Sequence, residues 1–215
     1  AEIRKMFVPR AGHVLVDADY SQIELRVLAH IADDTVMQDA FKSGLDVHTV
    51  TASQVFHVPF EEVTSLQRRN AKAVNFGIVY GISAWSLADD IKVSVGEAQD
   101  YIDAYLARYT GVKAYMDNIK ADAEKTGFVT TLYGRKRAIP ELKASNFNLR
   151  AFGQRAAMNT PIQGAAADII KLAMVRVDKR LRQEGLQARL ILQVHDELII
   201  EAPENERETV SLLLK

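Results

Sequence analysis

The sequence predicts an α+β fold in which strands from both ends of the chain enclose a helical insertion. A short apolar strand is expected at residues 13–16. A hairpin is expected near the other end, with strands at residues 190–194 and 198–201 and a tight turn near Asp196 and Glu197. Between these segments the apolar residues recur mostly at helical spacing, which indicates one sheet assembled from distant segments.

The helical middle carries recognisable start and stop signals. Ser21 and Glu24 have the pattern of a capping box, and so have Ser94 and Glu97. A second hairpin is expected at residues 128–140, with its turn near Gly134. The first expected helix begins at Ser21. Further helices are expected over residues 35–42, 46–56, 65–80, 94–108, 111–126, 146–159 and 161–184, the last of which begins at Pro161.

Composition excludes several classes of protein. The chain is 48% hydrophobic and 26% charged, which is typical of a soluble globular protein. It has no apolar run long enough to span a bilayer and no signal-peptide pattern, so no membrane partner is expected. Because it has no Cys, disulfides and thiolate metal sites are excluded, and the cytoplasm is the expected compartment. Neither end carries an ordinary start or stop signal, so we expect a piece of a longer protein.

The charges are distributed unevenly along the chain. Residues 130–190 contain 12 Lys and Arg against 4 Asp and Glu, whereas the remainder contains 15 and 24. A basic segment in an otherwise acidic chain fits a polyanionic partner together with a cation site. On charge alone, an ordinary solvated surface explains the pattern equally well.

Acidic residues follow the first predicted strand and also lie in the turn of the predicted C-terminal hairpin. His195, Asp196 and Glu197 interrupt the apolar hairpin, and Asp17 and Asp19 follow the first strand, where they share one face. Such acids often serve only as turn formers. The apolar flanks favour instead a buried acidic site held by divalent metal, because a buried carboxylate needs a compensating cation. Carboxylates from two adjacent strands can hold two ions about 3.5–4 Å apart, the spacing used for phosphoryl transfer.

One helix carries a mixed cationic and aromatic stripe. Arg68, Lys72, Phe76 and Tyr80 are successive i, i+4 neighbours and therefore lie along one face. The cationic end suits phosphates and the aromatic end suits a base or sugar, so the stripe fits a nucleoside triphosphate. The alternative is an amphipathic helix whose basic residues face water and whose aromatic residues face the core. The position of all four on one face favours the nucleotide.

Four stretches carry a resemblance to a known family. "DYSQIELRVLAH", "RRNAKAVNFGIVYG", "NTPIQGAAADIIK" and "QVHDEL" resemble segments of the family A DNA polymerases, the bacterial DNA polymerase I type, and the likeness covers nearly the whole chain. The resemblance implies an antiparallel palm sheet with a helical fingers insertion, part of a polymerase right-hand architecture. Residues 1–32 and 146–215 correspond to the palm and residues 33–145 to the fingers, with no counterpart of the thumb or exonuclease domains.

The resemblance also implies an activity, its cofactors and its partners. The activity is template-directed addition of dNTPs to a primer 3′-hydroxyl with two Mg²⁺ ions, for which Mn²⁺ can substitute. Asp19 and Asp196 are the expected metal ligands and catalytic residues, with Glu197 assisting. The expected partners are primer–template DNA and dNTPs, for a monomer that is part of a larger polymerase chain in the bacterial cytoplasm, held at the nucleoid through DNA.

Two other functions compete with DNA synthesis. The first is a palm–fingers piece that binds nucleic acid but is inactive unless it is joined to the thumb and C-terminal parts. The second is a metal-dependent nuclease, which the acids alone suggest. The stripe from Arg68 to Tyr80 argues against a nuclease, since hydrolysis needs no platform for a nucleotide base.

The resemblance assigns seven residues to the incoming dNTP: Arg68, Lys72, Phe76, Tyr80, Gln22, Glu24 and His48. Arg68 and Lys72 match the pair that binds the triphosphate, and Phe76 matches the residue that packs on the sugar. Tyr80 matches the aromatic residue near the template, and Glu24 matches the gate that excludes a ribose 2′-hydroxyl. Gln22 and His48 match residues near the triphosphate, although an ordinary polar role is the alternative for His48.

The resemblance assigns four residues to the primer–template next to the nascent pair: Arg155, Asn159, Gln163 and His195. Ordinary helix polar groups are the alternative for Asn159 and Gln163. The basic residues expected along the nucleic-acid backbone are Arg135, Lys136, Arg137 and Arg150. A solvated turn is the alternative for the first three. Gln154 stands where the family pattern has an acid before Arg155, so an ion pair there lacks its acidic partner.

Overall fold

The computed structural model describes residues 3–215, which form two compact units. The sheet unit contains the residues up to Ile23 together with Ala166–Lys215, and the helical unit is Glu24–Ala165. The units divide at other residues than the palm and fingers boundaries expected from the sequence. The assignment of the two domain names stays a prediction.

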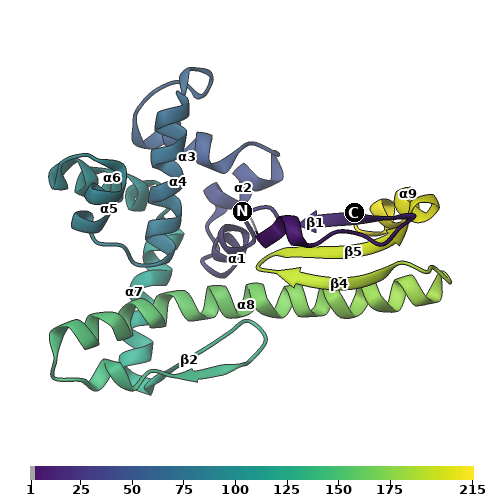
Figure 1. Cartoon of the computed structure of the whole chain (residues 1–215). Helices are drawn as coiled ribbons and strands as arrows, with labels where there is room; N and C mark the ends of the chain where they lie inside the picture. The colour runs from purple at the N-terminus through teal and green to yellow at the C-terminus, as the bar shows by residue number, and fades with distance from the viewer. Residues whose placement is uncertain (1–2) are drawn as a thin grey trace. The chain divides into compact units, whose positions relative to one another are not determined.

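The sheet unit is built on three antiparallel strands from opposite ends of the chain. β1 (His13–Asp19) pairs with β5 (Glu197–Pro203), which also pairs with β4 (Arg189–Val194), so β5 lies in the middle (Figure 1). The predicted sheet of distant segments is therefore confirmed. β1 continues to Asp19, three residues beyond its predicted end, and the hairpin turn lies at His195 and Asp196, one residue earlier than expected.

One face of this sheet is covered. Leu198, Ile200 and Ala202 alternate along β5 and are buried. Ile200 and Ala202 belong to one core cluster with residues of the C-terminal part of α8 and of α9 (Arg207–Leu213). The core of the unit consists of Leu181, Ala188, Ile200, Ala202 and Val210. Because side chains alternate across a strand, Glu197 on β5 and its partner Asp19 on β1 lie on the opposite face. The burial of the apolar face thus leaves the acids on the other face.

The helical unit contains seven helices before its hairpin, among its described residues. They are α1 (Ile23–Ile31, which starts in the sheet unit), α2 (Thr35–Lys42), α3 (Val47–Val55), α4 (Ser65–Val79), α5 (Ala84–Ile91), α6 (Val95–Arg108) and α7 (Thr110–Thr126). The hairpin is β2 (Phe128–Thr130) and β3 (Lys136–Ala138), as predicted.

Short 3₁₀ segments occur in both units. They lie at Ile3–Met6, Phe60–Glu62, Pro140–Lys143 and Glu204–Glu206.

The two predicted capping boxes have different outcomes in the structure. Ser94 and Glu97 form a capping box with both reciprocal hydrogen bonds at the start of α6. The start expected at Ser21 is wrong, because Gln22 has a φ of 57° and so cannot belong to a right-handed helix. α1 begins two residues later than expected, at Ile23.

Helix α8 spans Phe147–Gln183 without interruption, and the predicted break before Pro161 is wrong. A proline in a helix interior lacks the N–H that bonds to residue i−4 and costs about 3 kcal/mol. Ala157, Ile162 and Ala165 are fully buried on either side of Pro161. Their packing offsets the cost, and sequence periodicity alone does not reveal it. No helix within the described residues combines the length and the apolar character that a bilayer span requires.

Candidate active site

The strand pairing gathers the predicted acids at one end of the sheet. Asp19 lies opposite Glu197 in the β1–β5 register, and the Tyr20 N–H donates to the Asp196 carbonyl oxygen at 3.1 Å. Partial burial, and then the negative charges of Asp196, Glu197 and Asp17, raise the pKa of Asp19. The neighbouring negative charges therefore disfavour the ionised form of Asp19.

The acids are more open to solvent than the apolar flanks led us to expect. Asp19 is exposed, and Asp196 and Glu197 are partly buried. The expectation of a buried site is wrong because Leu198, Ile200 and Ala202 point to the covered face, whereas Asp19 and Glu197 point away from it.

This arrangement fits a magnesium site completed by substrate. Among residues 3–215, no group of three or more His, Asp or Glu side chains forms a metal cage made of protein alone. Mg²⁺ usually takes one or two carboxylates and completes its shell with water and substrate phosphates. Asp19 and Asp196 would hold the cation, whose positive charge would offset the repulsion that, together with the larger effect of desolvation, raises the pKa of Asp19.

The residues at the turn and after β1 have strained backbones. His195, in the turn beside Asp196, has a φ of 54°, and Gln22, three residues beyond Asp19, has a φ of 57°. His195 is exposed, and its carbonyl oxygen accepts a hydrogen bond from the Gln193 amide at 2.5 Å. Left-handed backbone costs a non-glycine residue about 1–2 kcal/mol and is concentrated at functional sites. Sequence patterns gave no sign of either conformation.

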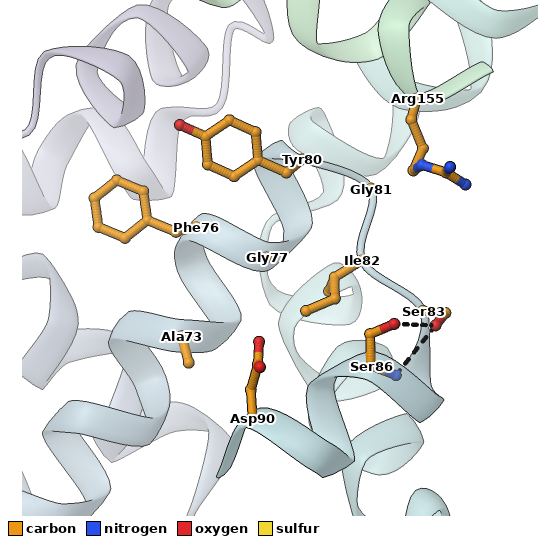
Figure 2. Close-up of a pocket in the computed structure, with 10 residues that line it drawn as sticks. All are labelled: Ala73, Phe76, Gly77, Tyr80, Gly81, Ile82, Ser83, Ser86, Asp90 and Arg155. Carbon is orange, nitrogen blue, oxygen red and sulfur yellow. Dashed lines mark hydrogen bonds between the residues drawn. The ribbon is translucent and has the colours of Figure 1, made fainter. Parts of the chain in front are cut away.

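The stripe on α4 is displayed rather than buried. Arg68, Lys72 and Tyr80 are exposed and Phe76 is half-buried, while the buried residues of the helix include Ala71, Val74, Asn75 and Ile78. The Lys72 Nζ lies 5.9 Å from the centre of the Phe76 ring. Figure 2 shows the Phe76 and Tyr80 rings projecting from the same side of α4. The alternative in which the aromatic residues of the stripe belong to the core does not describe this helix.

Arg68 is held by a partner that the sequence did not reveal. Its Nε donates to Asp46 Oδ2 at 2.8 Å and its Nη2 donates to Asp46 Oδ1 at 3.1 Å. Partial burial alone would raise the pKa of Asp46, but hydrogen bonds from Arg68 and Thr49 lower it to about 2. The same contact raises the pKa of Arg68. The pair is therefore charged on both sides at neutral pH.

His48 lies beneath the stripe and is only 2% exposed. Its ring centre is 5.7 Å from that of Phe76, and its Nδ1 is 3.1 Å from the Asn75 side-chain nitrogen. Burial lowers the pKa of His48 to about 4, with Arg68 and Lys72 acting in the same direction. His48 is thus a neutral support for Phe76.

Three predicted site residues meet around the Tyr80 hydroxyl. This group donates to Glu24 Oε2 at 2.7 Å and is also hydrogen-bonded by Gln163. Burial and the adjacent Glu24 carboxylate raise the pKa of Tyr80 to about 12, so the hydroxyl stays protonated. Spacing along the sequence could not show this contact, since Glu24 and Tyr80 lie on different helices.

The end of α4 also borders a cavity of about 560 Å³ (Figure 2). Its lining includes Phe76, Tyr80 and Asp90 of α5, together with the exposed Arg155 of α8. Gly81, which has a φ of 68°, lies so close to Arg155 that an added Cβ would be 2.9 Å from the Arg155 Cγ. Arg155 therefore lies close to the end of α4 that carries Tyr80.

Two other polar residues of α8, Asn159 and Gln154, differ in their hydrogen bonding. The Asn159 Oδ1 is buried without a hydrogen-bond partner. Gln154, where an acid was expected, donates to Glu124 Oε1 at 3.0 Å. The uncharged Gln154 side chain thus makes a hydrogen bond to a carboxylate where an acidic residue would have been available for an ion pair.

The basic hairpin is docked on α8 by its own cations. Arg135 donates to the Gly164 carbonyl oxygen at 3.0 Å, and Arg137 donates to Thr160 Oγ1 at 2.8 Å. The Lys136 Nζ lies 4.7 Å from the centre of the Phe128 ring. Arg150 is partly buried and donates to the Ala144 carbonyl oxygen at 3.0 Å. The first three residues remain exposed, so a structural role and a role toward DNA are compatible.

The chain is similar to known proteins over its whole length. A model of DNA polymerase family A matches residues 1–215. DNA polymerase I of Caldicellulosiruptor bescii is 55% identical over 213 residues, which are 99% of this chain and 25% of that protein. DNA polymerase I of Geobacillus stearothermophilus is 56% identical over 214 residues, which are 99% of this chain and 24% of that protein.

A solved structure matches the fold. The POL domain of Pol1 from M. smegmatis, in complex with DNA primer-template and dNTP, aligns with a TM-score of 0.93 and 45% identity over 99% of this chain and 38% of that one. This chain spans about a quarter of the length of the curated relatives it matches. From its sequence motifs, its fold and these relatives, the chain belongs to DNA polymerase family A.

Proposed function

We propose that the chain forms the palm and fingers of a template-directed DNA polymerase, which adds dNTPs to a primer 3′-hydroxyl by two-metal nucleotidyl transfer. The observation that carries the proposal is the register of β1 and β5, which places Asp19 opposite Glu197 and next to the turn that holds Asp196. Membership of the family and the DNA primer-template and dNTP bound by the solved relative support it. The palm is assigned to residues 1–32 and 146–215 and the fingers to residues 33–145.

The acids supply the metal-binding part of the reaction. Asp19 and Asp196 would hold two Mg²⁺ ions, or Mn²⁺ in their place, and Glu197 adds negative charge beside them. Bound there, the metal supplies Lewis-acid activation of the primer hydroxyl and neutralises charge on the pyrophosphate leaving group. The raised pKa of Asp19 supports this role, because like charges held together favour a cation.

The stripe supplies nucleotide binding. Arg68 and Lys72 bind the triphosphate, and Phe76, supported from below by His48, packs on the sugar. The hydrogen bond from Tyr80 fixes the Glu24 carboxylate, which in that position excludes a ribose 2′-hydroxyl. Gln22 and His48 complete the surroundings of the triphosphate.

The primer–template is held by residues of α8 and of the two hairpins. These are Arg155, Asn159, Gln163, His195, Arg135 and Arg137. Most of these groups make charge-based or polar contacts that do not read sequence, as a general copying enzyme requires. The unpartnered Asn159 Oδ1 supports a polar ligand at this position. The protein acts in the cytoplasm as a monomer within a larger polymerase chain.

Substitution of the acids tests the proposal. Asp19→Ala and Asp196→Ala are each expected to lower the rate of nucleotide incorporation by on the order of 1,000-fold, while the Kd for primer–template changes less than about twofold. Asp17→Ala is the matched control, and it is expected to retain incorporation. Asp17 lies on the same face of β1 as Asp19, but it pairs with Ile199 and so lies two residues further from the hairpin turn. Full incorporation by Asp19→Ala would refute the metal assignment.

A second candidate function follows from coverage, since the chain matches only 24–25% of the length of its relatives. It is a palm–fingers piece that binds nucleic acid but does not catalyse by itself. Primer extension by this chain, compared with extension by a complete family A polymerase carrying it as a graft, separates the two. Activity of the isolated chain supports the first function, and activity only in the graft supports the second.

A further inference from the structure

The contact between Asp46 and Arg68 joins α4 to the start of α3. Asp46 is the N-cap of α3, where its Oδ2 accepts the Thr49 N–H at 2.9 Å, and both of its oxygens accept hydrogen bonds from the Arg68 guanidinium. One carboxylate therefore fixes a helix start and a cationic side chain at once. A surface ion pair with such bidentate geometry is stronger than an ordinary one.

Asp46 is itself held in place by the packing of α3 on α4. Val47, His48 and Ala52 are buried, and the His48 side chain reaches Asn75 and Phe76 of α4. The carboxylate that holds Arg68 is thus attached to a helix whose position relative to α4 is fixed by its core. Arg68 is restrained by a rigid support rather than by another mobile surface chain.

The pairing leaves one edge of the guanidinium free for an anion. An arginine has five N–H donors, and Asp46 takes the Nε and one Nη2 donor. The other Nη2 donor and one Nη1 donor form the adjacent edge, which can bind a phosphate in bidentate fashion. The Arg68 side chain is 48% exposed, so this edge can reach a ligand from solvent.

We propose that Asp46 is a positioning residue, which presents the free edge of Arg68 to the triphosphate of the incoming nucleotide. The proposal rests on the proposed function, in which Arg68 binds that triphosphate. Holding the side chain before binding removes the entropy cost of ordering it afterwards, so affinity rises without a new contact to the ligand. In the opposite role, the negative charge of Asp46 competes with phosphate for Arg68, and removal of that charge would lower the KM for dNTP.

Asp46→Ser is the decisive variant. Serine retains a good N-cap for α3 but cannot form the ion pair. In the complete protein that carries this sequence, the KM for dNTP is expected to rise about 5- to 20-fold, while kcat changes less than about twofold. Asp46→Asn, which keeps the cap and the shape but loses the charge, is expected to raise the KM as well. Ser94→Ala, which removes the cap of α6 away from the stripe, is the matched control and is expected to leave the KM unchanged.

A double substitution separates failure of this inference from failure of the proposed function. Arg68→Ala is expected to raise the KM, and adding Asp46→Ser is expected to raise it no further. An unchanged KM in Arg68→Ala would refute the assignment of the triphosphate to the stripe. If Arg68→Ala raises the KM but Asp46→Ser leaves it unchanged or lowers it, only the positioning role of Asp46 is overturned. Additive effects in the double variant would also overturn it.

Discussion

Two residues, Asp19 and His48, illustrate opposite ways in which the fold tunes charge near the site. Asp19 is surrounded by other carboxylates, and its pKa is raised by partial burial and by their repulsion. His48 is enclosed beside two cations, and its pKa falls to about 4. A bound cation would therefore favour the ionised form of Asp19, whereas burial keeps His48 neutral beside Arg68 and Lys72.

The low pKa of His48 predicts a loss of stability in acid. An unfolded histidine titrates near 6.5, so as the pH falls from 6.5 towards 4 the unfolded chain takes up a proton that the folded chain refuses. The free energy of unfolding should decrease by up to roughly 3 kcal/mol across this window from His48 alone. Urea unfolding of the wild type and of His48→Gln at several pH values measures the difference in slope.

The control for this prediction is His30→Gln, which removes an exposed histidine of α1. Its pH dependence is expected to match that of the wild type. If His48→Gln also retains the wild-type slope between pH 6.5 and 4, then His48 is not kept neutral by burial.

At the scale of single elements, the helix boundaries show what local sequence can determine. The range predicted for α2 matches the structure, and the capping box of α6 is confirmed because local residues decide both. α5 was missed, since its eight residues end at Lys92 in a left-handed conformation rather than at a glycine. Pro161 was taken for a helix start because only tertiary packing shows that α8 continues through it.

The end of α4 offers a test at this scale. Gly81 needs both a positive φ of 68° and the absence of a Cβ, which would lie 2.6 Å from Met158 Cε and 2.9 Å from Arg155 Cγ. Gly81→Ala is therefore expected to lower the free energy of unfolding by about 2–4 kcal/mol, from backbone strain and from overpacking. Thermal unfolding with a two-state fit measures this loss.

Gly127→Ala is the matched control, because Gly127 has a φ of 77° but an added Cβ would meet no atom within 4 Å. It is expected to lose only about 1–2 kcal/mol from backbone strain. Equal losses in the two variants would show that the contact with Arg155 and Met158 is unimportant.

At the scale of the whole molecule, the arrangement of the sheet could be predicted and much of the site could not. Apolar strand patterns and strand-end acids indicated that segments from the two ends of the chain lie side by side in one sheet, and β1 and β5 do so. The i, i+4 spacing indicated the shared face of Arg68, Lys72, Phe76 and Tyr80. The partners Asp46 for Arg68 and Glu24 for Tyr80 come from other helices, so no periodicity along one element could show them.

The central claim is that carboxylates from opposite ends of the chain share divalent ions. Titration with Mn²⁺, followed by the electron paramagnetic resonance signal of the free ion, tests it most directly. Binding by the wild type and by Asp17→Asn is expected to be similar, whereas Asp19→Asn and Asp196→Asn should each weaken it by roughly tenfold or more. Undiminished Mn²⁺ binding in both Asp19→Asn and Asp196→Asn would contradict the claim.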